Sequence, residues 1–449
     1  MNVTGIIAEY NPFHSGHAYH IGEARRRTGA DFVVVAMSGD FVQRGGPALF
    51  DKYTRAHMAL LGGADLVLEL PAAFACSSAE EFAACGVALF DRIGITDCLC
   101  FGSEHGDTSA LLKGAAAMEQ ESSVFSGLLQ NELKNGATFP AARQTALKAI
   151  YSGIQDAEFL DLLSAPNNIL GLEYCKAILR QKTSLQPFAI LRKGDGYHDT
   201  ISKIPDASSQ NSLKFASATG IRTALFQQFP YGLSDLSDAD ASSRFSALSF
   251  LPETVRDVFC QAKPLWPEDF SSLLNGKILD MSQAEDRGAS EFCRLSDVSS
   301  DLALRLSRLA LDITGWEGRN AQLKTRQYTY TRINRTLTKI LLGITQEQIT
   351  SWKDLGYAPY ARILGFKKES SPLFAELKKS SRIPLITKPA AAFSLLSGPA
   401  LEEFQKDLYA SHLYQCAFCQ RYPSAPSDAP DTGHAVLKNE FNRKLLVLE

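Results

Sequence analysis

Long apolar runs are missing from this chain of 449 residues. No uninterrupted run approaches the roughly 18 residues that a membrane span needs, although hydrophobic residues make up 45% of the chain. The first twelve residues lack the basic and apolar stretches of an export leader, and nine scattered cysteines suit reduced thiols. We therefore expect a cytoplasmic protein that does not contact a membrane.

A second cysteine pair is missing as well. Cys416 and Cys419 have the spacing of a zinc knuckle, but only His412 and His434 lie near them. A structural zinc site needs four ligands in tetrahedral geometry. A structural metal is therefore the weaker alternative, and we expect free thiols and no metal held by the protein alone.

Strand and helix patterns alternate through the first hundred residues. We predict strands at 3–10, 31–39, 64–71 and 97–104, and helices at 17–29, 51–63 and 77–94. The run at 31–39 is apolar on both faces, as buried parallel strands are. A helix at 165–181, a strand at 187–193, the glycine-rich segment 194–199 and a helix at 212–228 follow. The alternation predicts an α/β fold with a doubly wound parallel sheet of the Rossmann-like kind.

A stretch rich in serine and aspartate after residue 230 indicates a domain boundary. We predict a first domain over 1–230, a mostly helical basic domain over 231–395, and an extension over 396–449 with no assigned role. Between 301 and 390, 16 basic residues outnumber 7 acidic ones, a balance of +9 against −12 elsewhere. This charge indicates a polyanionic partner, although a solvated, lysine-rich surface explains it equally well.

Two histidines flank a glycine where the first predicted strand ends and the first predicted helix begins. His14 and His17 would lie at the edge of an open α/β sheet where ligands bind, beside the free N–H groups of a helix N-terminus. Gly16 would let the backbone approach a phosphate, and the imidazoles could stabilise charge developing on its oxygens. A pair of surface or capping histidines is the alternative.

A second polar cluster, SATGIR, closes the predicted first domain. Ser217 and Thr219 offer hydroxyl groups, and Arg222 offers a planar fork that suits phosphate. Alone, this pattern is more often a helix cap. Its position at the end of the domain that the histidines open favours a phosphate-binding loop.

The order strand, H-x-G-H, helix resembles the superfamily of nucleotidylyltransferases and class I aminoacyl-tRNA synthetases, which activates ATP at its α-phosphate. Six segments narrow the resemblance to the tRNA(Met) cytidine acetate ligase family: GIIAEYNPFHSGHAYHI, MSGDFVQRGGPALFDKYTRAHMALLGGADLVLELP, PNNILGLEY, GYHD, FASATGIR and LKTRQYTYTRINRTL. Two positions depart from the pattern, namely Asp40 in place of an expected asparagine and Gly46 in place of an expected glutamate.

The resemblance implies an enzyme that uses ATP to activate acetate as acetyl-adenylate. The acetyl group would pass to N4 of the wobble cytidine, position 34, of elongator tRNA(Met), without acetyl-CoA and with Mg²⁺ on the pyrophosphate. His14, His17 and Arg222 would be catalytic. The expected ATP-binding set is Ile7, Ala8, Glu9, Tyr10, Asn11, Pro12, Phe13, His14, Ser15, Gly16, His17, Ala18, Tyr19, His20, Gly102, Asn167, Arg192, Ser217, Thr219 and Arg222.

Some members of this set also have simpler explanations. Gly102 could form a turn, Asn167 could cap a helix, and Arg192 could be a surface charge. Asn168 is the neighbouring candidate for the position of Asn167.

The basic region would bind the tRNA. Its expected contacts mix cations with aromatic rings, as single-stranded RNA sites do: Arg326, Tyr328, Tyr330, Arg332 and Arg335. A core helix or strand with a basic edge is the alternative for this segment. For the whole protein, the alternatives are a small-molecule adenylyltransferase of the same superfamily and a non-catalytic RNA-binding protein.

Overall fold

The computed structural model describes residues 1–449 except 120–122, 138–140, 143–144, 147–148, 150–161, 164, 193–215, 235, 424–436 and 438. The predicted glycine-rich segment 194–199, the start of the predicted helix at 212–228, and His434 lie outside the described residues.

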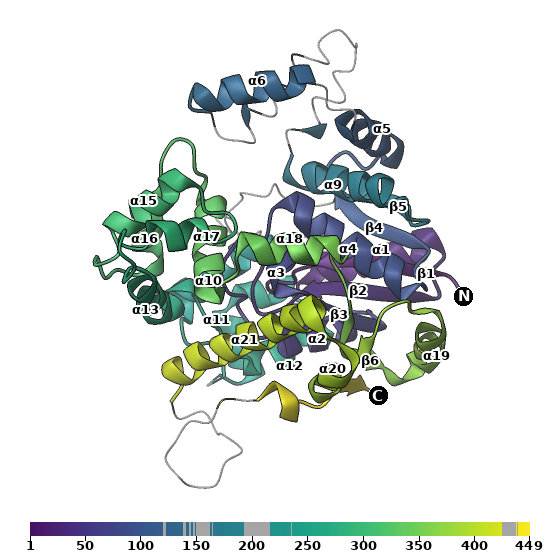
Figure 1. Ribbon diagram of the computed structural model, residues 1–449. Coiled ribbons are helices and arrows are strands. Elements are labelled where there is room, and N and C mark those ends of the chain that lie inside the picture. Colours follow the sequence, from purple (N-terminus) through teal and green to yellow (C-terminus); the bar gives the residue numbers. More distant parts are fainter. Residues whose placement is uncertain are drawn as a thin grey trace.

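One sheet organises the protein, with strand order β5-β4-β1-β2-β3-β6-β7 and with β8 paired to β6 (Figure 1). The strands are β1 Val3–Ala8, β2 Phe32–Ser38, β3 Leu66–Leu70, β4 Cys98–Ser103, β5 Gln186–Leu191, β6 Ala361–Lys367, β7 Leu385–Ile386 and β8 Leu446–Leu448. All described pairs are parallel except β3 with β6. The predicted doubly wound, mostly parallel sheet is confirmed.

The sheet is buried on both faces, which explains why its strands read as apolar runs. In β2, Val33 and Val35 join one hydrophobic core, whereas Val34 and Ala36 join the other. Alternate side chains of a strand point to opposite faces. Each face is therefore covered by its own layer of helices, as expected for parallel strands.

The helices of the first half connect these strands. They are α1 Ser15–Thr28, α2 Lys52–Leu61, α3 Ala72–Ala75, α4 Ala79–Ile93, α5 Thr108–Glu119, α6 Ser123–Lys134, α9 Pro166–Gln181 and α10 Ala218–Gln228. Gly29 ends α1 with a φ of 66°, in the left-handed region that favours glycine. The helices predicted before residue 100 and at 165–181 are confirmed within a few residues.

The second half is mostly helical, as expected. Its α-helices are α11 Asp238–Arg244, α12 Glu253–Gln261, α13 Ser271–Met281, α14 Ala289–Cys293, α15 Ser300–Arg308, α16 Trp316–Leu323, α17 Tyr330–Leu342, α18 Gln346–Asp354, α19 Ser371–Ser380, α20 Pro389–Leu395 and α21 Gly398–Arg421. Helices α13 and α15–α17 gather to one side of the sheet (Figure 1).

Three strands of the second half were not predicted, and they extend the sheet of the first half. Strand β6 pairs with β3, and both β7 and β8 pair with β6. The sheet therefore uses residues on both sides of the predicted boundary at 230. It also gives the extension 396–449 a structural place, through β8 and through α21, which packs against α3 and α18.

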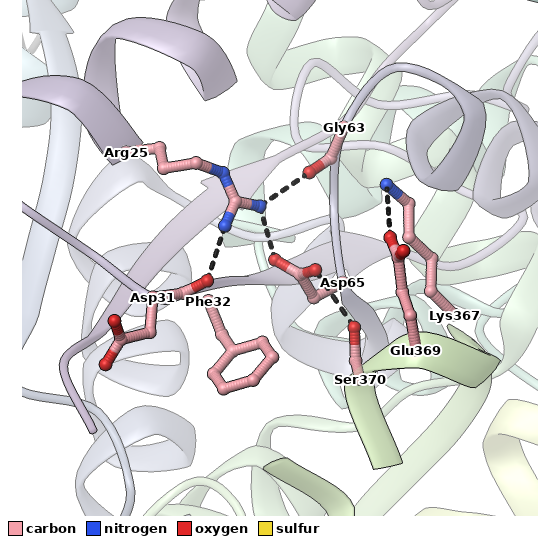
Figure 2. Close-up of a pocket in the computed structure, with 8 residues that line it drawn as sticks. All are labelled: Arg25, Asp31, Phe32, Gly63, Asp65, Lys367, Glu369 and Ser370. Carbon is pink, nitrogen blue, oxygen red and sulfur yellow. Dashed lines mark hydrogen bonds and ion pairs between the residues drawn. The ribbon is translucent and has the colours of Figure 1, made fainter. Parts of the chain in front are cut away.

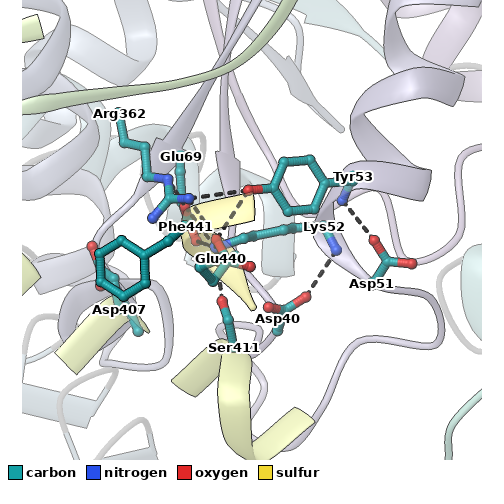
Figure 3. Close-up of polar contacts among 12 residues, drawn as sticks. Asp40, Asp51, Lys52, Tyr53, Glu69, Arg362, Asp407, Ser411, Glu440 and Phe441 are labelled. Carbon is teal, nitrogen blue, oxygen red and sulfur yellow. Dashed lines mark hydrogen bonds and ion pairs between the residues drawn. The ribbon is translucent and has the colours of Figure 1, made fainter. Parts of the chain in front are cut away.

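A buried network of charged side chains holds this added layer (Figure 3). Lys52 Nζ lies 2.8 Å from Glu69 Oε1 and 3.4 Å from Glu440 Oε2. Arg362 contacts the same two carboxylates at 3.2 and 2.5 Å, and the Tyr53 hydroxyl donates to Glu440 at 2.9 Å. Two cations thus balance two carboxylates away from water, which is the condition for a buried ion-pair network to be tolerated.

The two positions that depart from the family pattern are accommodated differently. Asp40 is buried, its Oδ1 accepts the Lys52 backbone N–H at 2.8 Å, and burial raises its pKa to about 6. Gly46 has a φ of 100°, and its N–H donates to Thr338 Oγ1 at 2.7 Å. A glutamate there would face open space but would strain the backbone.

In the part of the chain that the structure describes, no helix combines the length and apolar character needed to cross a membrane. The same residues contain no cluster of three or more histidine, cysteine or acidic side chains suited to a metal ion. Cys416 and Cys419 both lie on α21, and neither forms a disulfide bond among the described residues.

Candidate active site

A cleft of about 580 Å³ opens where β1 and β4 end. The chain continues from β1 to β2 on one side, whereas β4 and β5 lie on the other. This reversal of strand order leaves a crevice at the carboxyl ends of the strands, where open α/β sheets bind ligands. The described residues that line the cleft come from both halves of the chain: 6–11, 14, 16–17, 19–20, 42–45, 47, 49, 82, 101–102, 167, 170, 174, 190–192, 216–219, 222, 265–267, 330–331 and 334.

The histidine pair begins α1 at the centre of this cleft. His14 is the N-cap, and its Nδ1 accepts the Gly16 N–H at 3.0 Å. The His14 N–H donates to His17 Nδ1 at 3.3 Å, and the two rings stack with centroids 3.7 Å apart. Tyr10 and Phe13 lie against the His17 ring at 4.8 and 5.6 Å. Capping, one of the alternatives, is thus part of the role of His14.

These contacts determine which ring nitrogen carries the proton. Because both Nδ1 atoms accept backbone N–H groups, each neutral ring carries its proton on Nε2. Burial, with smaller contributions from Arg192 and Arg222, lowers the pKa of His14 to about 3. Burial and neighbouring positive charge lower the pKa of His17 well below its usual value. The pair therefore offers the cleft two neutral N–H donors at neutral pH.

The loop SATGIR starts α10 beside the segment that carries the histidines. Ser217 caps the helix, with its Oγ accepting the Gly220 N–H at 3.1 Å. Arg222 donates to the Asn11 carbonyl oxygen and to Thr219 Oγ1, the latter at 3.1 Å. Burial lowers the pKa of Arg222 to about 10, so its guanidinium stays charged at neutral pH. The structure thus brings Arg222 to the segment that carries the histidines.

The β4–β5 side of the cleft carries the other three predicted residues. Gly102, Asn167 and Arg192 all line it. A Cβ at Gly102 would lie 3.3 Å from Cγ of Arg192, so the glycine leaves room for that side chain. Asn167 is fixed through its Nδ2, which donates to Glu104 Oε1 at 2.5 Å. Asn168, the neighbouring candidate, is buried and accepts from Ser103 Oγ at 2.7 Å, which removes it from the cleft.

The predicted segment 7–20 divides between cleft and core. Its members that line the cleft are Ile7, Ala8, Glu9, Tyr10, Asn11, His14, Gly16, His17, Tyr19 and His20. Its members outside the lining are Pro12, Phe13, Ser15 and Ala18. Pro12 and Phe13 are buried, whereas Ser15 and Ala18 lie half-buried in the first turn of α1.

The five residues expected to bind tRNA do not form one surface. Tyr330 lines the cleft and is half exposed, and Arg326 is exposed. Tyr328 is buried, and its hydroxyl lies 2.6 Å from Ser299 Oγ. A buried ring offers no face to a base, so Tyr328 is removed from the expected set.

The two remaining arginines of that set have partners within the protein. Arg332 lies over the ring of Tyr328, 5.0 Å from its centroid. Arg335 Nε lies 3.5 Å from Asp297 Oδ2. Both are only partly exposed, so neither is a freely projecting cation.

Several cleft residues were not predicted from the sequence. Gln43 and Arg44 follow β2, and the Gln43 N–H donates to Glu9 Oε1 at 3.0 Å. Trp266 and Asn334 reach the cleft from the second half of the chain. The segment around Gln43 has no helical or strand periodicity, and no local pattern links Trp266 or Asn334 to the histidines.

A second hollow, of about 400 Å³, lies beside β6 and the C-terminal end of α1 (Figure 2). Arg25 donates there to Asp65 at 2.5 Å, to the Gly63 carbonyl oxygen at 3.1 Å and to the Asp31 carbonyl oxygen at 2.6 Å. The other cation of this hollow, Lys367, lies 3.7 Å from Glu369 Oε1, so both cations are already paired within the protein. The cleft at the histidines remains the candidate site.

The cleft geometry, together with a doubly wound sheet whose H-x-G-H helix begins where the strand order reverses, defines a nucleotidyl transferase. A family model described as HIGH Nucleotidyl Transferase matches residues 1–427. A tRNA(Met) cytidine acetate ligase from Acetivibrio thermocellus is 35% identical, over 94% of this chain and 96% of the relative. One from Clostridium tetani is 36% identical, over 86% and 90%. The chain belongs to the tRNA(Met) cytidine acetate ligase family.

Solved structures agree with this assignment. The crystal structure of Thermotoga maritima TmcAL bound with alpha-thio ATP superposes with a TM-score of 0.82. Its apo form superposes with a TM-score of 0.83. Both are 27% identical, and all of each chain is covered.

Proposed function

We propose that this protein activates acetate with ATP and transfers the acetyl group to N4 of the wobble cytidine of elongator tRNA(Met). The observation that carries the proposal is the pair of neutral Nε2–H donors of His14 and His17 at the N-terminus of α1, with the charged Arg222 beside them. The family relationship supplies the substrates.

The first step joins two anions. Acetate is a weak nucleophile, and a triphosphate repels it, so the site must neutralise the phosphates and align the carboxylate with the α-phosphorus. Arg222 supplies fixed charge, while His14 and His17 supply donors for charge that develops on the α-phosphate oxygens. Gly102, Asn167 and Arg192 would hold the nucleotide on the β4–β5 side. An acetate oxygen then bonds to phosphorus, and pyrophosphate leaves.

Mg²⁺ is expected on the leaving pyrophosphate. This ion keeps several waters and uses one or two carboxylates together with substrate phosphates. Glu9 is the one carboxylate among the described residues that line the cleft, and it fits this role. When bound, the ion would neutralise the leaving group.

The second step needs no nucleophile from the protein. N4 of cytidine attacks the acyl carbon of acetyl-adenylate, a C–N bond forms, the C–O bond to AMP breaks, and N4 releases one proton to solvent. The mixed anhydride is already activated, so acetyl-CoA would be dispensable.

The basic part of the second half would bind the tRNA, and the first 230 residues would make the adenylate. Arg326 and Tyr330 are the exposed members of the expected set, with Arg332 and Arg335 nearby on α17. An enzyme that modifies tRNA must meet it in the cytoplasm, which is the location we propose.

Pyrophosphate exchange into ATP, measured with a panel of carboxylates and without RNA, tests the first step. We expect exchange that depends on acetate and Mg²⁺. Exchange that no carboxylate stimulates would overturn the proposal. For the second step, acetyl-CoA supplied without ATP should give no acetylated tRNA(Met), whereas ATP with acetate should.

A further inference from the structure

Apart from the segment 7–20 and the SATGIR loop, the residues expected to hold ATP lie on one side of the cleft. Gly102, Asn167 and Arg192 lie on the side of β4 and β5. The other side, beyond the end of β2, is lined by the loop at 42–49, by 265–267 and by α17. The histidine pair lies between the two. An acceptor that attacks an adenylate made at the histidines would enter from this second side.

Helix α17 packs so closely against the loop at 42–49 that no side chain fits at Gly45. A Cβ at Gly45, whose φ is 81°, would lie 2.3 Å from the backbone N of Arg335 and 2.7 Å from Cβ of Asn334. The next residue, Gly46, donates its N–H to Thr338 at 2.7 Å. The position of α17 relative to the cleft is therefore fixed by backbone contact.

Two buried side chains fix the orientation of the Asn334 side-chain amide. Its Oδ1 accepts from Nε1 of Trp316, a fully buried side chain, at 2.9 Å. It also accepts from Nδ2 of Asn320, which is buried as well. An indole N–H can only donate, so this contact assigns the oxygen to the inner position. The outer group is then Nδ2, with two N–H donors and no acceptor among the described residues.

An aromatic ring stands one helical turn before this amide. Tyr330 is the first residue of α17, lines the cleft and is 51% exposed. Lys324 Nζ lies 5.8 Å from its ring centroid. Residues four apart share one face of a helix, so the ring and the amide face the cleft together. A ring beside hydrogen-bond donors is the arrangement that reads an unstacked base.

From this geometry, and resting on the proposed function, we infer that Asn334 selects cytidine at the acceptor side of the cleft. Its Nδ2 donates to N3 of the base, which is an acceptor in cytosine, while Tyr330 stacks on the ring. Uracil presents an N3–H donor instead of the N3 acceptor, so it is rejected. The base edge is thereby held with N4 toward the adenylate.

Asn334→Asp provides a test that preserves shape. The carboxylate still accepts from Trp316 and Asn320, but it donates nothing to the base. Acetate-dependent exchange without tRNA should stay within about twofold of wild type, and acetyl transfer should fall about 10- to 100-fold, the scale of a lost base contact. Tyr330→Ala should also lower transfer with normal exchange, whereas Tyr330→Phe, which keeps the ring, should not.

Base selection is measured directly by the binding of two tRNA(Met) transcripts with cytidine or uridine at position 34. ATP is present and acetate is omitted, so no reaction occurs. Wild type should prefer cytidine, and Asn334→Asp should lose or reverse this preference because its carboxylate accepts the uracil N3–H. If this variant loses exchange as well as transfer, Asn334→Ser, which also lacks the amide donors, is measured in its place. Its ratio of affinities for the cytidine and uridine transcripts should be lower than that of wild type.

Two outcomes separate the inference from the proposed function. Wild type that catalyses no acetate-dependent exchange would refute the function. Wild type that exchanges and transfers, beside an Asn334 variant with unchanged transfer and unchanged cytidine preference, would refute only the inference.

Discussion

His14 does two jobs that different substitutions can separate. Its Nδ1 caps α1 through the Gly16 N–H, and its Nε2–H faces the cleft. In His14→Asn, the side-chain Oδ1 can reach the place of Nδ1, and asparagine is among the best N-caps. In His14→Gln, the amide nitrogen can reach the place of Nε2. The first variant keeps the cap and loses the donor, and the second does the reverse.

The magnitudes of the two effects differ. Loss of one preorganised donor lowers the rate by about 10²- to 10³-fold, or about 2.7–4 kcal/mol of transition-state stabilisation. Loss of a cap costs about 0.5–2 kcal/mol of stability. We expect His14→Asn to exchange pyrophosphate at least 10²-fold more slowly while melting near wild type. His14→Gln should melt earlier and retain more activity. His57→Asn, on α2 outside the cleft lining, is the matched control.

Exchange measured at saturating ATP and acetate, beside thermal melting, decides this prediction. A His14→Asn enzyme with a nearly normal rate would show that the ring only caps the helix. The pH dependence gives a second check. Because the pKa of His14 is about 3 when folded and about 6.5 when unfolded, the neutral ring stabilises the protein above pH 6.5. That contribution is lost as the pH falls from 6.5 toward 3. A rate that falls with a pKa of 6–7 attributable to His14 would contradict the neutral donor.

Three other changes probe the frame of the site and the tRNA surface. Lys52→Met should lower the free energy of unfolding by about 3–5 kcal/mol in urea titrations, since it leaves buried carboxylates short of a cation. Lys368→Met, at an exposed ion pair, should cost less than about 1 kcal/mol, and equal losses would contradict the argument. Gly45→Ala should have a clearly lower melting temperature than Gly46→Ala, because only the first substitution adds an atom against the α17 backbone. Similar melting temperatures would show that the loop does not pack against α17 in this way. Arg326→Ala should leave melting unchanged and reduce the log–log salt slope of tRNA binding by roughly 0.7–0.9. An unchanged slope would exclude Arg326 from the tRNA surface.

Local pattern predicted the first four strands and the histidine site because their signals lie within short stretches of chain. Strand β6 escaped prediction because its stability comes from distant residues. Its Arg362 is directly paired with Glu69 of β3, and Glu440 completes the charge balance. A buried arginine in a strand looks unfavourable until those partners are known.

The error at Tyr328 had a readable signal. Thr329 caps α17, so Tyr328 is the residue before the cap and Ile333 is the fourth helical residue. Apolar residues at these two positions often pack together as a hydrophobic staple. Both lie in the same hydrophobic core here. The mixture of aromatic and basic residues suggested RNA, whereas the spacing indicated a helix start.

The charged network beside β3 joins residues that are synthesised at very different times. Tyr53 and Glu440 are 387 positions apart, and nascent chains grow at about 5–20 residues per second, so the partner is made about 20–80 s later. During that interval Lys52 lacks Glu440, and β3 lacks its neighbour β6 for most of it. The half of the protein that carries the histidines is translated first, but its sheet and its ion-pair network are complete only when the last residues have been added. A ribosome that stopped before residue 440 would release a chain whose catalytic sheet lacks a counter-charge, and such a chain would be a natural target for proteolysis.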